Sequence, residues 1–179
     1  MREDLRIKGM ERIRKIFRHP LYSEHLHKLM EAETDREYCR HDISHFLDVA
    51  RISYIYALED SAGLQKEIIY AAALLHDIGR YTEISEGIPH ETAGAELSEI
   101  ILGDCGFAEA DIAEIKNAIS RHRKGGSGLL AEYIYRADKQ SRRCFECNAA
   151  ASCKWSEEKK NHDILILISA DKAHKGGYV

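Results

Sequence analysis

The chain has 179 residues, of which 44% are hydrophobic and 31% charged, and its formal net charge is −4. This length suits one domain with a substantial core, and the composition excludes a disordered chain. The negative charge gives no reason to expect nucleic-acid binding, and the longest apolar run near either end, 164–169, is too short to span a bilayer. Two prolines among many Ala, Leu, Ile, Glu and Lys residues favour helix almost throughout.

The N-terminal stretch MREDLRIKGMERIRKIF is charged along its whole length and shows no secretory signal. We therefore expect a cytoplasmic protein without membrane association. Its five cysteines are then reduced thiols or metal ligands.

Hydrophobic periodicity predicts the first three helices. The first carries a stripe of apolar residues and ends at RHP, 18–20; the stripe consists of Ile7, Met10, Ile13, Ile16 and Phe17. The second covers 21–33, with Leu21, His25, Leu29 and Ala32 on one side. The third is capped by Asp42 or Ser44 and runs to about Leu58, with Val49, Ile52 and Tyr56 facing inward.

Four further helices are predicted at 65–78, from about Glu91 to Leu102, at about 109–122 and at 129–140. Gly79 is placed to end the first of these in a left-handed C-cap, and 80–89 is predicted to be a loop. The segment 141–162 is irregular, and 163–169 is either a short strand or a tail. We predict an all-α, single-domain helical bundle over 1–179, with its core at about 38–140 and a cysteine-bearing extension at 141–179.

Five predicted helices carry an imidazole or carboxylate at one end of an inward-facing stripe. These residues are His45, His76 with Asp77, His90, His122 and Asp138. Burying such groups is costly unless they are paired or bound to a metal, although any one histidine can be satisfied by a backbone carbonyl. Since five stripe ends can converge on one cavity, we predict a site for divalent iron, manganese or zinc. The helix C-termini at His76, Asp77 and His122 also favour a cation.

The chain contains two other His-Asp pairs. His162-Asp163 lies in the charged run SEEKKNHD and is interpreted as solvated surface. His41-Asp42 is ambiguous, because Asp42 can be an N-cap while His41 stands one turn before His45 and is a further candidate ligand.

The order of His45, His76-Asp77 within LLHDIG, and Asp138 within YRADK resembles the HD-domain superfamily of metal-dependent phosphohydrolases, over about residues 38–140. His90 in PHETAGAEL and His122 in AISRHRKGG resemble its dinuclear branch, which includes dinucleoside tetraphosphate hydrolases and HD-GYP phosphodiesterases. The resemblance implies one ion held by His45, His76, Asp77 and Asp138, and a second held by Asp77, His90 and His122. The Gly-Tyr-Pro motif is missing, which counts against cyclic-dinucleotide cleavage.

The resemblance further implies cleavage of a phosphoester or phosphoanhydride by a metal-activated hydroxide, with His76 and Asp77 as the catalytic pair. The expected partner is a small phosphorylated molecule, a nucleotide or a dinucleoside polyphosphate, and a homodimer is left open. Four basic residues are candidates for binding phosphate, or are alternatively ordinary helix-end charges: Arg80, Arg123, Lys124 and Lys139. A catalytically silent regulatory module and a purely structural helical protein are the alternative hypotheses.

Cys144, Cys147 and Cys153 form a C-x2-C-x5-C pattern that suggests a small metal knuckle or cluster. Structural zinc usually takes four ligands, so a fourth, such as His162 or Cys39, must come from elsewhere. The alternative is that these cysteines are free thiols or packing residues. Trp155 nearby is interpreted as a core anchor for the segment.

Overall fold

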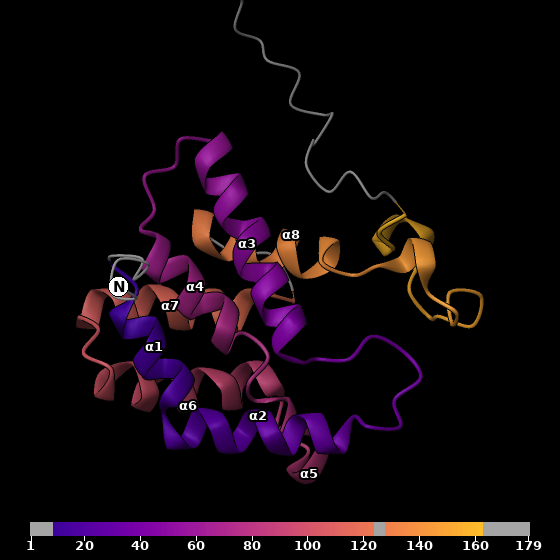
Figure 1. Ribbon diagram of the computed structural model, residues 1–179, viewed down its shortest axis with the longest axis horizontal. Helices are drawn as coiled ribbons and strands as arrows, with labels where there is room; N and C mark the ends of the chain where they lie inside the picture. Colours follow the sequence, from indigo (N-terminus) through magenta and orange to yellow (C-terminus); the bar gives the residue numbers. More distant parts are fainter. Residues whose placement is uncertain (1–8, 124–127, 163–179) are drawn as a thin grey trace, which may run out of the picture.

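The computed structural model describes residues 9–123 and 128–162, and its regular structure is entirely helical (Figure 1). The helices are α1 (Glu11–Arg18), α2 (Pro20–Ala32), α3 (Ile43–Glu59), α4 (Lys66–Leu75), α5 (Arg80–Glu86), α6 (His90–Asp104), α7 (Glu109–Arg121) and α8 (Leu129–Gln140), followed by the short 3-10 helices η1 (Cys144–Glu146) and η2 (Glu157–Lys159). The all-α prediction is confirmed. The strand or tail considered at 163–169 lies outside the described residues.

Helix α4 forms the centre of the bundle, with α1, α3, α7 and α8 packed around it. Between Ile68 and Gly79 every residue except Tyr70 is buried. The three consecutive alanines 71–73 let the neighbouring helices approach closely, because they add little side-chain volume. The chain therefore carries His76 and Asp77, at the end of this helix, into the interior.

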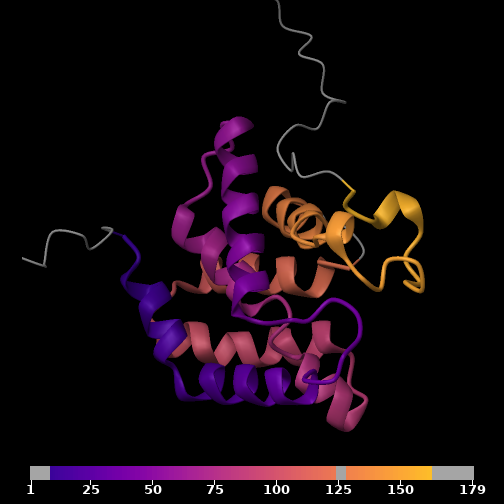
Figure 2. The same ribbon diagram turned by 45° about the vertical axis from the view of Figure 1, so that its right-hand side comes forward.

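Helices α2, α5 and α6 pack against one another on one side of this core, and residues 141–162 project at another edge, close to the segment between α2 and α3 (Figures 1 and 2). None of the described helices is long and apolar enough to cross a membrane. The side chain of Asp42 accepts a hydrogen bond of 2.9 Å from the backbone N–H of His45, so Asp42 rather than Ser44 caps α3.

The prediction for the segment around Gly79 is wrong. Helix α4 ends at Leu75, Gly79 has an ordinary right-handed φ of −78°, and α5 occupies most of the predicted loop. The left-handed glycine is Gly87, with φ of 76°, at the end of α5. Helix α5 buries none of its residues, so its sequence shows no apolar stripe.

Gly79 is required for space rather than for φ. A Cβ atom there would lie 2.4 Å from both the backbone nitrogen of Gly94 and the carbonyl oxygen of His90. This contact brings the start of α6 against the turn that contains His76 and Asp77. Among the other predicted inward residues, Phe17, Ala32 and Ile100 are exposed, whereas Tyr22, which was not predicted, is fully buried.

Candidate metal centre

The polar residues at the ends of the apolar stripes lie together at one place in the interior. His45 lies in the first turn of α3, His76 and Asp77 directly follow α4, and His90 begins α6. His122 follows α7, and Asp138 lies in the last turn of α8. All six side chains are buried. The structure thus brings together all six residues that the sequence singled out as metal ligands.

The first group consists of His45, His76, Asp77 and Asp138, whose donor atoms all lie within 4.8 Å of one another. Nε2 of His76 is 3.2 Å from Oδ2 of Asp77, and Nε2 of His45 is 3.4 Å from Oδ1 of Asp138. Burial alone would raise the pKa of both carboxyls. The nearby cationic and hydrogen-bonding groups outweigh this and hold both pKa values well below the ordinary range.

The second group consists of Asp77, His90 and His122 and meets the same 4.8 Å spacing. Nε2 of His90 and Nε2 of His122 each lie 3.3 Å from Oδ1 of Asp77. Asp77 thus turns one carboxylate oxygen to each group, which is the arrangement needed for a carboxylate that bridges two cations.

Hydrogen bonds on the far side of each ring fix which nitrogen faces the centre. Nδ1 of His76 donates to the carbonyl oxygen of Ala73 at 2.7 Å, and Nδ1 of His122 donates to that of Ile119 at 2.6 Å. Since a carbonyl can only accept, each Nδ1 carries a proton, and Nε2 of each ring is the nitrogen that faces the carboxylates.

His45 and His90 are oriented in the same way. Ser141 Oγ donates to the carbonyl oxygen of Asp138 and therefore accepts from Nδ1 of His45 at 3.0 Å. Nδ1 of His90 donates to the Glu83 carboxylate at 2.7 Å. A further group of His90, Glu83 and Glu91 also meets the 4.8 Å spacing. We interpret its Glu83 contact as orienting the His90 ring.

The residues fit divalent ions. Nε2 of His76 is buried without a hydrogen-bond partner, and nitrogen and carboxylate donors are the ligand set of such ions. In the absence of an ion, burial acts to lower the pKa of His76, but Asp77 and Asp138 raise it to about 9. A proton on His76 then provides part of the positive charge that an ion would supply.

Arg142 is the main residue that the sequence interpretation missed. Its buried guanidinium donates from Nη2 to Oδ1 of Asp138 at 2.9 Å and to Nε2 of His45 at 3.0 Å. Arg142 stands four residues after Asp138, so helical spacing offered a signal. Its positive charge lies against two donor atoms of the first group.

His41, considered as a further ligand, lies beside the first group. Its Nδ1 contacts the carboxylate of Glu33 at 2.8 Å, and its Nε2 lies 3.5 Å from Oδ2 of Asp77. Burial lowers the pKa of His41 to about 4, so its ring is neutral near pH 7. His41 is absent from the groups that meet the 4.8 Å spacing, and so it borders the centre.

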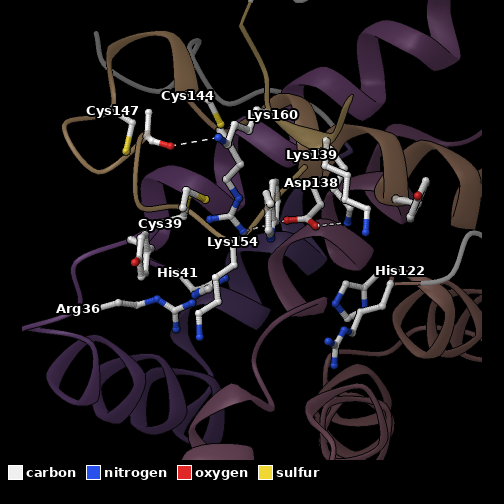
Figure 3. Close-up of a pocket in the computed structure, with 18 of the residues that line it drawn as sticks. Arg36, Cys39, His41, His122, Asp138, Lys139, Cys144, Cys147, Lys154 and Lys160 are labelled. Carbon is white, nitrogen blue, oxygen red and sulfur yellow. Dashed lines mark hydrogen bonds and ion pairs between the residues drawn. The ribbon is translucent and has the colours of Figure 1, made fainter. Parts of the chain in front are cut away.

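Three of the four basic residues predicted to bind phosphate line a cavity of about 510 Å³ beside the centre (Figure 3). Nε of Arg80 lies 2.9 Å from Oδ1 of Asp77, and Nζ of Lys139 donates to Oδ2 of Asp138 at 2.7 Å. Arg123 is exposed, and its Nη1 lies 3.8 Å from Oε2 of Glu91. Lys124 lies outside the described residues.

The cavity is walled by the centre on one side and by the extension on the other. His122 and Asp138 contribute from the centre, and Cys144 and Trp155 contribute from the extension. Trp155 is only half-buried, so its interpretation as a core anchor is wrong.

Residues 42–172 match the family of the HD domain, and that range includes the whole proposed ligand set. The chain belongs to the HD-domain family. Its metal-binding cluster is therefore the His/Asp cluster of an HD domain.

The chain is similar to a relative and to a solved structure over most of its length. The chain is 43% identical over 155 residues to an uncharacterized protein of Clostridium beijerinckii. The matched region covers 87% of this chain and 99% of the relative. The chain also resembles the crystal structure of a "predicted HD superfamily hydrolase" from an uncultured Thermotogales bacterium. That likeness has a TM-score of 0.58 and 26% identity, and covers 84% of this chain and 87% of the other.

Proposed function

We propose that this HD-domain protein is a metal-dependent phosphohydrolase that cleaves a phosphoester or phosphoanhydride bond in a nucleotide or a related small molecule. The observation that carries the proposal is the position of Asp77. One of its oxygens faces the His76 ring, and the other faces the rings of His90 and His122. All of them lie at the edge of a cavity lined by cationic side chains.

The charge of the cavity supports a phosphorylated substrate. Among the described residues that line it, Asp138 is the single carboxylate, whereas eight carry positive charge: Arg36, Arg80, Arg123, Lys139, Arg142, Lys154, Lys159 and Lys160. Guanidinium and ammonium groups are the usual partners of phosphate oxygens. This excess of cations over carboxylates favours a ligand with several negative charges.

The size and remaining lining of the cavity suit an organic group attached to the phosphates. A volume of about 510 Å³ lies within the range of small-molecule sites. Tyr38, Tyr135 and Trp155 also line it, and flat aromatic faces can pack against a nucleobase. We therefore favour a nucleotide over inorganic polyphosphate.

The residues divide the work as follows. His45, His76, Asp77 and Asp138 would hold one divalent ion, and Asp77, His90 and His122 the second. Bound iron or manganese supplies a hydroxide at neutral pH and neutralises charge on the phosphoryl group. Arg80 and Lys139, which contact Asp77 and Asp138 from the cavity side, are placed to bind phosphate oxygens of the substrate.

The test is a phosphatase screen with the full chain. Protein loaded in turn with Mn²⁺, Fe²⁺ or Co²⁺ is assayed for product release from nucleoside monophosphates, nucleoside triphosphates and dinucleoside polyphosphates. We expect turnover of at least one class, abolished by a chelator and by Asp77→Ala but retained by the control Glu96→Ala on the exposed face of α6. Metal binding without turnover of any of these compounds would favour the regulatory module instead.

A further inference from the structure

Four of the five cysteines line the side of the cavity that lies opposite the metal centre. Cys39, from the segment between α2 and α3, lines this side together with Cys144, Cys147 and Cys153 from the extension. All four are half-buried and not engaged in disulfides, whereas the fifth, Cys105, is buried in the core. Figure 3 shows Cys39, Cys144 and Cys147 on one side of the cavity, with Lys160 beside Cys144.

Both chain neighbours of Cys39 are hydrogen-bonded to the extension. The hydroxyl of Tyr38 donates to the carbonyl oxygen of Ser152, next to Cys153, at 3.1 Å. On the other side, Nη1 of Arg142 donates to the carbonyl oxygen of Arg40 at 3.3 Å. These two contacts hold Cys39 opposite the extension although the two segments are about a hundred residues apart in the chain.

Two of the extension thiols belong to one short turn. Cys144 opens the 3-10 helix η1, and the backbone N–H of Cys147 donates to the carbonyl oxygen of Cys144 at 3.3 Å. This single turn keeps the two residues of the C-x2-C pair close together in space.

The electrostatics agree with a single cluster. Burial raises the pKa of the Cys39 thiol, Arg142 opposes that shift, and Cys144, Cys147 and Cys153 are all near enough to add to it. The pKa of Lys160 is raised by its hydrogen bond to Glu157 and also by Cys153 and Cys144. The Lys160 ammonium and the Arg142 guanidinium therefore lie near enough to balance part of the negative charge that bound thiolates would bring.

We propose that Cys39, Cys144, Cys147 and Cys153 are the four thiolate ligands of an iron–sulfur cluster of the 4Fe–4S class. Such clusters are held by four cysteine thiolates, one on each iron, and each thiol gives up its proton on binding. His162, the other candidate for a fourth ligand, is exposed and paired with Glu157. The assignment uses no residue of the His/Asp centre and does not depend on the proposed function.

The spacing of the thiols favours a cluster over a single ion. Tetrahedral zinc with Zn–S bonds of about 2.3 Å draws its sulfur atoms to about 3.8 Å from one another. No three of these described cysteines have sulfur atoms that all lie within 4.8 Å of one another, whereas the His/Asp groups do. A four-iron cluster separates its thiolates more widely, because each thiolate binds a different iron.

The cluster would link the extension covalently to the segment before α3. Arg142 reaches Asp138 and His45 from a position two residues before Cys144, and Lys154 directly follows Cys153. Fixing these thiols therefore also fixes cationic side chains in the wall of the cavity.

The decisive experiment measures acid-labile sulfide, which the His/Asp centre cannot supply. The full chain is purified without oxygen and reconstituted anaerobically with ferric iron, an excess of a thiol reductant and sulfide. We expect about four sulfides per chain, together with a broad visible absorption band that dithionite bleaches. The variant Cys147→Ser/Cys153→Ser should lose the sulfide and the band, whereas Cys105→Ala and Asp77→Ala should keep both.

Three results would overturn the assignment. The first is a reconstituted chain without sulfide. The second is a single Zn²⁺ on the same thiolates, recognised after Co²⁺ exchange by sulfur-to-cobalt charge-transfer bands. The third is a disulfide among these cysteines in the anaerobically purified protein. If the double variant is insoluble, Cys39→Ser replaces it in the comparison and should lose most of the sulfide; full retention of sulfide by Cys39→Ser would also contradict the proposal.

Discussion

His90 and His122 place their Nε2 atoms 3.1 Å apart, and each of these atoms lies 3.3 Å from Oδ1 of Asp77. Both Nδ1 atoms are engaged elsewhere, with the Glu83 carboxylate and the carbonyl oxygen of Ile119. The Nε2 atoms of both rings and one carboxylate oxygen therefore face the same small space. These three atoms are a donor set for a divalent cation, which is the physical reason to propose a second ion.

Removing both rings should remove that ion. We predict that His90→Ala/His122→Ala lowers the manganese content from two ions to one per chain, because the first group keeps all of its donors. Native mass spectrometry of the folded variant gives the count. The matched control is His27→Ala, which removes an exposed histidine of α2. Two ions retained by the double variant would rule out these histidines as ligands.

Glu83 should affect binding of the second ion through His90. Its carboxylate accepts from Nδ1 of His90 at 2.7 Å, and loss of such an outer contact typically weakens metal binding about 10- to 100-fold. Glu83→Gln should therefore lower the affinity for the second ion by that factor and leave the affinity for the first ion unchanged. Competition with a chelating dye measures both affinities. Glu86→Gln, exposed on the same helix α5, is the control. Equal affinities in the two variants would show that the contact has no orienting role.

Metal uptake should depend on pH in a defined direction. The pKa of His76 in the metal-free protein is raised from its ordinary value of 6.5 to about 9. The bound proton stabilises the metal-free fold fully below pH 6.5, and this contribution is lost as the pH rises through about 9. Because an ion must displace that proton, the apparent affinity should rise between these two pH values. Calorimetry in buffers of different ionisation enthalpy should detect proton release, and an affinity that stays flat over this range would contradict the assignment of His76 as a ligand.

The contact between the turn after α4 and α6 should be intolerant of a single methyl group. Gly79→Ala places a Cβ atom 2.4 Å from backbone atoms of His90 and Gly94, and we expect it to destabilise the fold by about 1–3 kcal/mol or more. Gly103→Ala is the control. Its Cβ meets nothing within 4 Å inside α6, so it should stabilise the protein by up to about 1 kcal/mol. Urea unfolding measures both, and similar stabilities would mean that the close approach at Gly79 is not needed.

The positions of the six proposed ligands could be predicted from sequence because each one ends an apolar stripe. The buried run at 71–75 leads directly to His76 and Asp77, and Ile115 and Ile119 lead to His122 in the same way. Helical spacing alone therefore indicated their direction toward the core. Arg142 lay within reach of the same reasoning, being one turn beyond Asp138.

For other residues around the centre, the sequence contains no apolar stripe or helical spacing that predicts their positions. Glu33 and Glu83 stand eight and seven residues before the histidines that they orient, and the chain turns between them. Because the two residues of each pair do not lie in the same helix, helical spacing does not predict that they meet. Helix α5 was predicted to be a loop because it packs without burying a residue, and the partnership of Cys39 with the extension depends on tertiary contacts through Tyr38 and Arg142.

We propose that hydrolysis needs two ions held around Asp77. The most direct measurement is product release from the best nucleotide of the screen while manganese is added stepwise to chelator-treated protein. We predict no activity without metal, a maximum reached at two ions per chain, and no detectable activity at any metal level for folded, helical His76→Ala or Asp77→Ala. Full activity at one ion per chain, or near-normal turnover by either variant, would contradict this account.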